Sequence, residues 1–299
     1  MLIVMIILAT IFMFALPLVL AIILTKRYNA TWRTIGVGVL AYLVTQSVLM
    51  LLAWGLQYLL QNQLSTEIAG LSLTTLLSYA LAWLSCIFAI LTLWFSFHYL
   101  KKEGDSWIGA LAIGVGFGGA ESFLMGFEAV SVFYPYVVGI IAGVQSLGLS
   151  ASDASALTNS LGSFLATPWY FPLTYVIDRA AYLSVYLAVA VVVWQALTKR
   201  KWMWLWLVGG AVWLIFVQTL NNIVANISTA SYWTELFLFV VMLISLEALY
   251  WYKVSVLDKQ SENEADPVTG EIIEATSTTS AETVEPTGNA KPRRVKKAK

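Results

Sequence analysis

Long apolar stretches alternate with short polar stretches along most of the chain. Crossing a hydrocarbon core of ~30 Å takes about 20 predominantly apolar residues. Seven stretches meet this requirement: 2–24, 32–60, 73–99, 106–127, 170–197, 202–225 and 233–252. The pattern predicts an all-α, polytopic membrane helical bundle of about seven transmembrane helices over residues 1–253, with the lipid bilayer as its main partner.

Basic residues gather at alternate ends of these stretches. They are Lys26, Arg27, Arg33, Lys101, Lys102, Lys199, Arg200, Lys201 and Lys253. Loops rich in Lys and Arg stay on the cytoplasmic side of a membrane. The pattern therefore predicts a multi-pass protein of the cell membrane, with its N-terminus outside and its C-terminal tail in the cytoplasm.

Residues 128–168 do not fit this alternation directly. Residues 129–149 are apolar but contain Pro135 and three glycines, and residues 150–163 are polar. The preceding span begins at the basic end and the following span returns to it, so an even number of crossings must lie between them. Because 150–163 is too polar to provide a crossing, we expect an outer-side extension, a re-entrant hairpin or a cap.

Composition separates the membrane part from the C-terminal tail. Hydrophobic residues make up 59% of the chain and charged residues 11%, whereas about a quarter of an average soluble chain is charged. Residues 254–299 are rich in Glu, Thr, Ser and Pro, which predicts a disordered, charged tail. Its terminal KPRRVKKAK is expected either to touch anionic lipid or to keep the tail soluble. The balance of 17 basic and 17 acidic residues predicts no nucleic-acid partner.

Ionisable residues inside apolar spans are costly to bury and mark candidate functional sites. Glu121 lies in the fourth stretch and Asp178–Arg179 lie in the fifth. A rise of about 1.5 Å per residue places them at one depth, in the outer third of the membrane. The sixth stretch brings three amides to the same level: Gln218, Asn221 and Asn222. One interpretation is structural pairing of Arg179 with an acid. The other is a water-accessible site in which Glu121 is a general base or proton carrier.

Glycines surround Glu121 in the sequence GVGFGGAESFLMG. Their spacing predicts close helix packing, and Gly118 and Gly119 would also let a substrate or water approach the carboxylate. Cys86 and His98 are the only cysteine and histidine. These counts exclude an intrachain disulfide and any metal site that needs two imidazoles from one chain. We therefore expect no metal and no other cofactor.

Two of these segments resemble the YhfC family of intramembrane proteases. GVGFGGAESFLMG is similar to the family's glycine-rich segment around a glutamate, and WYFPLTYVIDRAAYLSVYLAVAVVVWQAL is similar to its segment around an acid–arginine pair. The resemblance covers most of 1–253 and implies catalytic roles for Glu121, Asp178 and Arg179, with Asp replacing Glu. The family's two metal-binding histidines fall at Tyr186 and Gln218, so the divalent metal of the relatives would lack both histidine ligands here. Glu121, Asp178 and neutral oxygens remain, which are a poor set for zinc.

Three classes of function follow from these features. The first is a YhfC-like protease homologue, either active or a pseudoenzyme that binds a membrane peptide or a lipidated protein without cutting it. The missing histidines favour the pseudoenzyme. Its pocket would contain Tyr186, Gln218, Asn221 and Asn222 together with Gly118 and Gly119. The second class is a proton-coupled small-molecule transporter, and the third is a structural subunit of a membrane complex.

Overall fold

The computed structural model describes residues 1–60, 67–68, 71–100, 106–198, 203–227 and 232–254. The chain divides into two compact units, Met1–Leu249 and Tyr250–Lys299. The first unit contains the helical bundle. Apart from Val254, the tail 254–299 lies outside the described residues, so its disorder stays a prediction.

The described residues form eight α-helices and one short 3-10 helix. The α-helices are α1 (Leu2–Tyr28), α2 (Trp32–Leu60), α3 (Leu73–Leu100), α4 (Trp107–Ile141), α5 (Ala151–Leu165), α6 (Phe171–Thr198), α7 (Met203–Ile227) and α8 (Tyr232–Tyr252), and the 3-10 helix is η1 (Val144–Leu147). Seven of the helices, all except α5, are long and apolar enough to cross a membrane. The predicted all-α, multi-pass membrane fold is confirmed.

Helix α4 lies at the centre of the bundle. It contacts α1, α2 and α6, while α7 contacts α3 and α6. Every residue of α4 from Ala112 to Ala120 is buried. Small residues make this possible: a Cβ atom added to Gly116 would lie against the Ile35 carbonyl oxygen of α2, and one added to Gly38 would lie against the Ile113 carbonyl oxygen. Two glycines thus let α2 and α4 cross with their backbones in contact.

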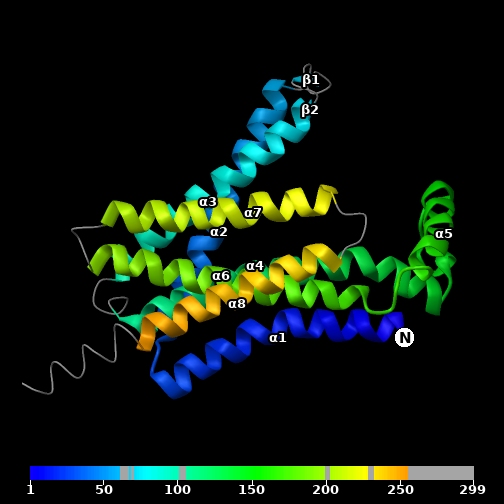
Figure 1. The fold of residues 1–299 in the computed structure, drawn as a ribbon. Coiled ribbons are helices and arrows are strands. Elements are labelled where there is room, and N and C mark those ends of the chain that lie inside the picture. The colour runs from blue at the N-terminus through cyan, green and yellow to red at the C-terminus, as the bar shows by residue number, and fades with distance from the viewer. Residues whose placement is uncertain (61–66, 69–70, 101–105, 199–202, 228–231, 255–299) are drawn as a thin grey trace, which may run out of the picture. The chain divides into compact units, whose positions relative to one another are not determined.

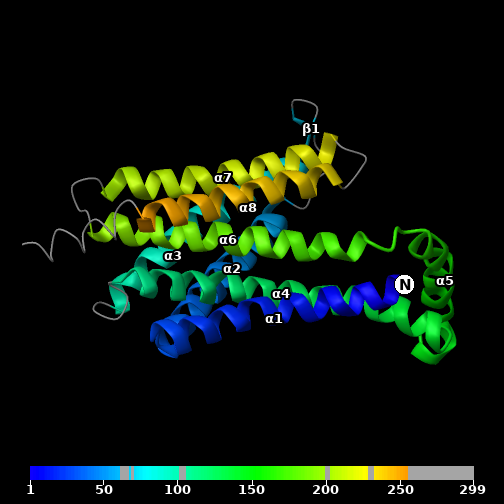
Figure 2. The same cartoon turned by 60° about the horizontal axis from the view of Figure 1, so that its bottom comes forward.

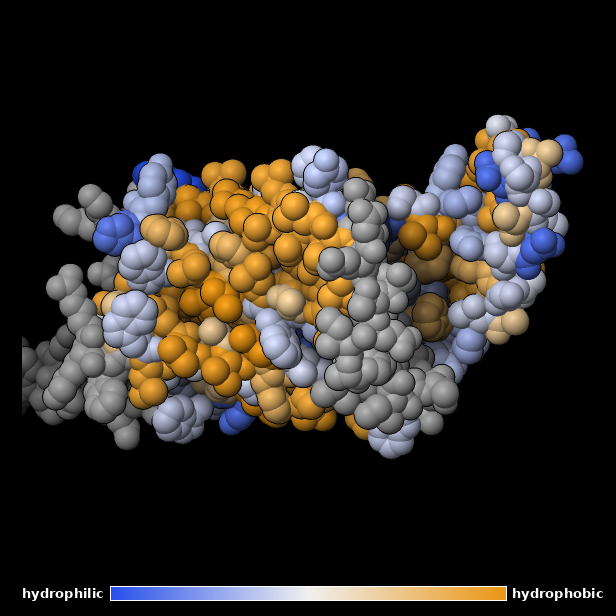
Figure 3. Space-filling view, turned by 90° about the horizontal axis from the view of Figure 1, so that it is seen from above, coloured by the Kyte–Doolittle hydropathy of each residue, from blue (hydrophilic) through white to orange (hydrophobic). Residues whose placement is uncertain are grey.

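Helices α2 and α3 form a pair that leans away from the other helices toward one end (Figure 1). At that end they are joined through two short strands, β1 (Glu67–Ile68) and β2 (Leu71–Ser72), which pair antiparallel. The N-terminus of α1 and helix α5 lie at one end of the bundle, and the α1–α2 connection lies at the other (Figures 1 and 2). A broad apolar surface covers the middle of the bundle, with more polar residues toward its ends (Figure 3).

Helix α4 is longer than the sequence predicts. It continues past residue 127 and through Pro135 to Ile141. Proline removes one helical hydrogen bond, but such breaks are tolerated in membrane helices when neighbouring elements hold the segment. Here Phe133 packs on Tyr175 of α6 with ring centroids 5.9 Å apart. The helix therefore continues through Pro135.

The segment after α4 adds no membrane-spanning helix. Helix α5 runs crosswise to the bundle at its end (Figures 1 and 2). It is attached to the extension of α4 by a stack of Tyr136 on Phe164, with ring centroids 4.5 Å apart. The structure thus agrees with the predicted lack of a return crossing, and the choice among an outer-side extension, a re-entrant hairpin and a cap stays a prediction.

Candidate functional site

An ion pair joins α4 to α6 in the middle of the bundle. Nη1 of Arg179 donates a hydrogen bond to Oε1 of Glu121 across 3.3 Å. Both side chains are nearly buried, with 11% and 12% of their surfaces exposed. The other carboxylate oxygen, Oε2, is buried and has no hydrogen-bond partner among the described residues. Of the two acids that the sequence offers to Arg179, the structure pairs it with Glu121.

A chain of polar contacts continues from this pair to α7. The guanidinium carbon of Arg179 lies 5.2 Å from the ring centroid of Tyr182, a favourable cation–π distance. The Tyr182 hydroxyl donates to Oε1 of Gln218 and accepts from Nδ2 of Asn221, each across 3.3 Å. The predicted meeting of Glu121, Arg179, Gln218 and Asn221 at one level is therefore present in the structure.

Tyr186 stands one helical turn after Tyr182 and lies beside Glu121. The two side chains interact through the tyrosine hydroxyl, and the Tyr186 ring packs on Phe117 of α4 with centroids 5.0 Å apart. Tyr186 therefore lines the candidate site. Asn222 lies on α7, but its side chain is outside the described residues, so its place in the pocket stays a prediction.

Asp178 takes part in a different pair. Its carboxyl group lies within hydrogen-bonding reach of Glu235 on α8. Oδ1 of Asp178 and Oε2 of Glu235 are buried without hydrogen-bond partners among the described residues. Of these adjacent residues, Asp178 therefore contacts α8 and Arg179 contacts α4.

The glycines next to Glu121 serve helix contacts. A Cβ atom on Gly118 would lie 2.8 Å from Cδ1 of Leu183 on α6, and one on Gly119 would lie 3.0 Å from Cβ of Pro17 on α1. Gly114 also faces α6. Both glycines thus have packing contacts, and Gly119 also lines a cavity of about 450 Å³ between α1, α2 and α4. Their predicted place in a substrate pocket stays a prediction.

Sequence reasoning did not single out Tyr182 or Glu235. Tyr182 lies four residues after Asp178 and four before Tyr186, a spacing that puts all three near one face of a helix. That spacing is a signal that could have identified it. Glu235 lies so close to the start of its span that its sequence position resembles that of a solvated end residue.

A cleft of about 690 Å³ lies between the α2–α3 pair and α4. Its walls include Gln46, Leu49 and Ser85, and on α4 they include Met125 and Glu128. Tyr42 also lines the cleft. We call it the α2–α4 cleft.

Tyr42 connects the α2–α4 cleft to the candidate site. Its hydroxyl forms a hydrogen bond with Gln46 in the cleft, and it interacts electrostatically with Glu121 and Arg179. The Tyr42 ring packs edge-on against Phe117 with centroids 5.3 Å apart. Tyr42 therefore lines the cleft and also interacts with the ion pair.

The family model for the YhfC intramembrane metalloprotease matches residues 12–244. The matched region includes the ion pair, the tyrosine–amide chain and both walls of the α2–α4 cleft. The chain belongs to this family. No curated protein and no solved structure matches it.

The family is described as one of metalloproteases. The side chains around Glu121 do not form a site that fits a divalent ion. Glu121 is engaged by a cationic guanidinium, and the amide and hydroxyl groups around it bond to one another. Among the described residues no three His, Cys, Asp or Glu side chains are close enough to hold a metal ion. Zinc prefers His, Cys and carboxylate ligands, so this donor set does not fit it.

His98 cannot complete such a site. It lies in the last turn of α3 and stacks on Trp94 with ring centroids 6.0 Å apart. Glu121 lies fourteen residues into α4 from Trp107, or about 21 Å along the helix at 1.5 Å per residue. The imidazole and the carboxylate therefore lie at different levels of the bundle.

Proposed function

We propose that this YhfC protein binds a transmembrane peptide segment in the α2–α4 cleft and holds it beside Glu121 without metal-dependent hydrolysis. The observation that supports this most strongly is that Tyr42, which lines the cleft, also interacts electrostatically with Glu121 and Arg179. The protein acts as a membrane-peptide receptor or regulator built on a protease fold.

The lining of the cleft suits a peptide more than a purely apolar ligand. An unwound peptide in a membrane needs partners for its backbone N–H groups. Ser47 and Ser85 line the cleft, and each hydroxyl already donates to a carbonyl of its own helix. Their oxygens therefore remain available as acceptors, and the Gln46 amide adds another polar group. Leu49 and Met50 supply apolar contacts for side chains.

An acidic side chain in the lining of the cleft indicates which transmembrane peptides would bind there. Glu128 is the only charged side chain among the described residues that line the cleft, and it is exposed. A peptide with a basic side chain at this level gains an ion pair there. We therefore propose transmembrane segments that carry a lysine or arginine near one end.

The ion pair favours binding over hydrolysis. A general base must reach the water that it activates, and Oε1 of Glu121 is bonded to Arg179. Without imidazole ligands, no metal site polarises a peptide carbonyl at this position. The remaining groups, a tyrosine–amide chain and a buried carboxylate, are suited to hydrogen bonding with a peptide.

Binding of two synthetic peptides tests the proposal. Each is a 21-residue leucine–alanine transmembrane peptide, one with lysine near one end and one with norleucine there. In lipid nanodiscs, the wild-type protein is expected to bind the lysine peptide up to about five-fold more tightly, the upper range for an exposed ion pair. Fluorescence anisotropy of labelled peptides measures both affinities.

Two variants assign the effect to the cleft. Glu128→Gln is expected to bind both peptides equally. Asp153→Asn removes an exposed acid on α5, outside the cleft, and should keep the lysine preference. Absence of binding to either peptide would contradict the proposal, as would a preference that survives Glu128→Gln.

The orientation proposed for the bundle places the α2–α4 cleft in its outer half. Lys26, Arg27 and Arg33 lie near the α1–α2 connection, which we propose to be cytoplasmic by the positive-inside rule. The opposite end, with the N-terminus and α5, then faces outside.

Cysteine labelling in intact cells tests this orientation. Cys86 is buried and is the only cysteine, so Cys86→Ala provides a background without reactive thiols. In it, Ser152→Cys on α5 is expected to react with a membrane-impermeant maleimide, whereas Thr31→Cys should react only after permeabilisation. The reverse pattern would show the opposite orientation.

A further inference from the structure

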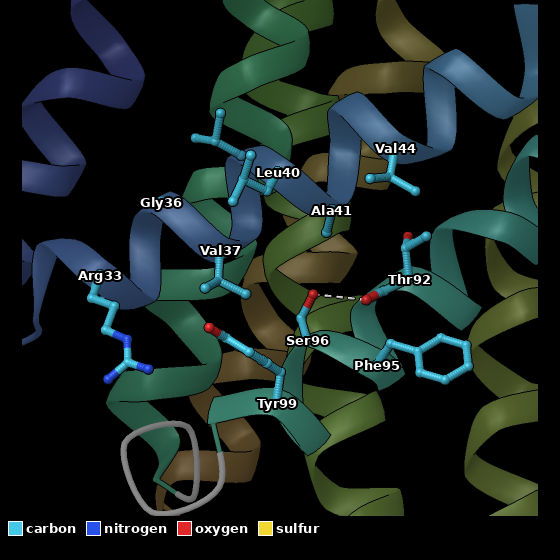
Figure 4. Close-up of a pocket in the computed structure, with 11 residues that line it drawn as sticks. Arg33, Gly36, Val37, Leu40, Ala41, Val44, Thr92, Phe95, Ser96 and Tyr99 are labelled. Carbon is cyan, nitrogen blue, oxygen red and sulfur yellow. Dashed lines mark hydrogen bonds between the residues drawn. The ribbon is translucent and has the colours of Figure 1, made fainter.

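A second groove, of about 830 Å³, lies between α2 and α3, and one of its lining residues, Arg33, lies in the first turn of α2, just after the α1–α2 connection. This volume is within the range of ligand sites, about 300–1,000 Å³. Figure 4 shows Arg33 and Tyr99 at one end of this groove. Its walls are formed by apolar side chains farther along both helices: Val37, Leu40, Val44 and Phe95. We call it the α2–α3 groove.

The α2–α3 groove has the length of one membrane leaflet. Arg33 and Val44 are eleven residues apart on α2, or about 16 Å at 1.5 Å per residue. That is roughly half of a ~30 Å hydrocarbon core. Near the Val44 end, the hydroxyls of Thr45 and Thr92 lie 2.8 Å apart and join α2 to α3. The groove thus runs from a cation to an interhelical hydrogen bond near mid-membrane.

Among the described residues, the polar end of the groove contains one basic side chain, that of Arg33. The guanidinium carbon of Arg33 lies 5.9 Å from the ring centroid of Tyr99, a cation–π contact that holds the charge beside the groove. A basic side chain near a membrane surface attracts anionic lipid.

The walls of the groove face the bilayer. Leu40 is 60% exposed and Phe95 is 61% exposed, and both lie on helices long and apolar enough to span the membrane. A soluble anion would contact Arg33 but leave these walls uncovered. An amphipathic ligand with an anionic head and a long apolar chain matches both parts.

We propose that the α2–α3 groove binds one anionic phospholipid, with its phosphate headgroup at Arg33 and an acyl chain between α2 and α3. This site is separate from the α2–α4 cleft and does not depend on the function proposed for it. The bound lipid would bridge the two helices that form one wall of that cleft.

Native mass spectrometry of the purified full chain tests the headgroup contact. The probes are phosphatidylglycerol and phosphatidylcholine with identical acyl chains. The wild-type protein is expected to bind phosphatidylglycerol with about five-fold higher affinity, since one basic residue near a membrane surface contributes ~1 kcal/mol toward anionic lipid. Arg33→Gln should abolish this preference.

Arg27→Gln is the matched control. Arg27 lies at the same end of the neighbouring helix and also makes a cation–π contact, 5.8 Å from the ring centroid of Tyr28. It does not line the groove, so its replacement should leave the preference intact. An equal loss in both variants would show general surface attraction and overturn the proposal.

A second pair of variants tests the acyl-chain contact. A Cβ atom on Gly36 meets nothing within 4 Å, so Gly36→Leu should fold and narrow the groove. It is expected to weaken phosphatidylglycerol binding several-fold. Gly55→Leu, also with open space on α2 but outside the groove, should not. Unchanged lipid binding in both Arg33→Gln and Gly36→Leu would overturn the proposed site, and unchanged binding in Gly36→Leu alone would overturn the acyl-chain placement.

Discussion

Arg179→Gln is expected to destabilise the protein by about 3–5 kcal/mol, because removing one partner of a buried ion pair leaves the other charge uncompensated. The Glu121 carboxylate would lose its hydrogen bond to Nη1, and its Oε2 already lacks a partner among the described residues. The change should be measured as the free energy of unfolding in mild detergent.

A double variant separates this effect from general damage to α6. Glu121→Gln/Arg179→Gln removes both charges and leaves two amides, and replacing both members of a buried pair is often close to neutral. It should therefore recover at least half of the loss. Arg27→Gln, an exposed arginine, should change stability by less than about 0.5 kcal/mol. If Arg179→Gln lowered the free energy of unfolding no more than Arg27→Gln does, the ion pair would not stabilise the bundle.

Gly38→Ala is expected to cost about 3 kcal/mol, the upper end for overpacking. Its Cβ atom would press on the Ile113 carbonyl oxygen and lie 3.0 Å from the Phe117 amide nitrogen. Backbone atoms cannot move aside as a flexible side chain can, so α2 and α4 must separate. The same unfolding measurement reports the loss.

Gly55→Ala is the matched control for this crossing. It lies on the same helix with no atom within 4 Å of the added Cβ, so the expected change is within about 0.5 kcal/mol. The separation of α2 from α4 would also widen the α2–α4 cleft, so Gly38→Ala should alter peptide binding more than Gly55→Ala does. Equal stability of the two variants would contradict the close crossing.

The helical spans and the level of the buried polar residues could be predicted from the sequence. Span length follows from bilayer thickness, and a fixed rise per residue places Glu121, Arg179 and Gln218 at similar depth. Which acid meets Arg179 could not be predicted, because Asp178 is adjacent to it in sequence. The choice depends on how α6 is rotated against α4 and α8.

The extension of α4 and the role of Glu235 also required the structure. Pro135 has a local tendency to end a helix, and the contacts that hold its continuation, Phe133 on Tyr175 and Tyr136 on Phe164, are visible only in the structure. Glu235 meets Asp178 because of where α8 lies beside α6, which no periodicity in one helix specifies. Tyr42 and Gln46 gain their importance from the α2–α4 cleft, a feature of three helices together.

The most direct test of the central claim is mass spectrometry of the lysine-bearing transmembrane peptide after incubation with the protein in nanodiscs. Wild type and Glu121→Gln are each incubated with added zinc and, separately, with a chelator. The site described here predicts that the peptide stays intact in all four samples while it binds the wild-type protein. Shorter products that require zinc and disappear in Glu121→Gln would contradict it and show a working metalloprotease.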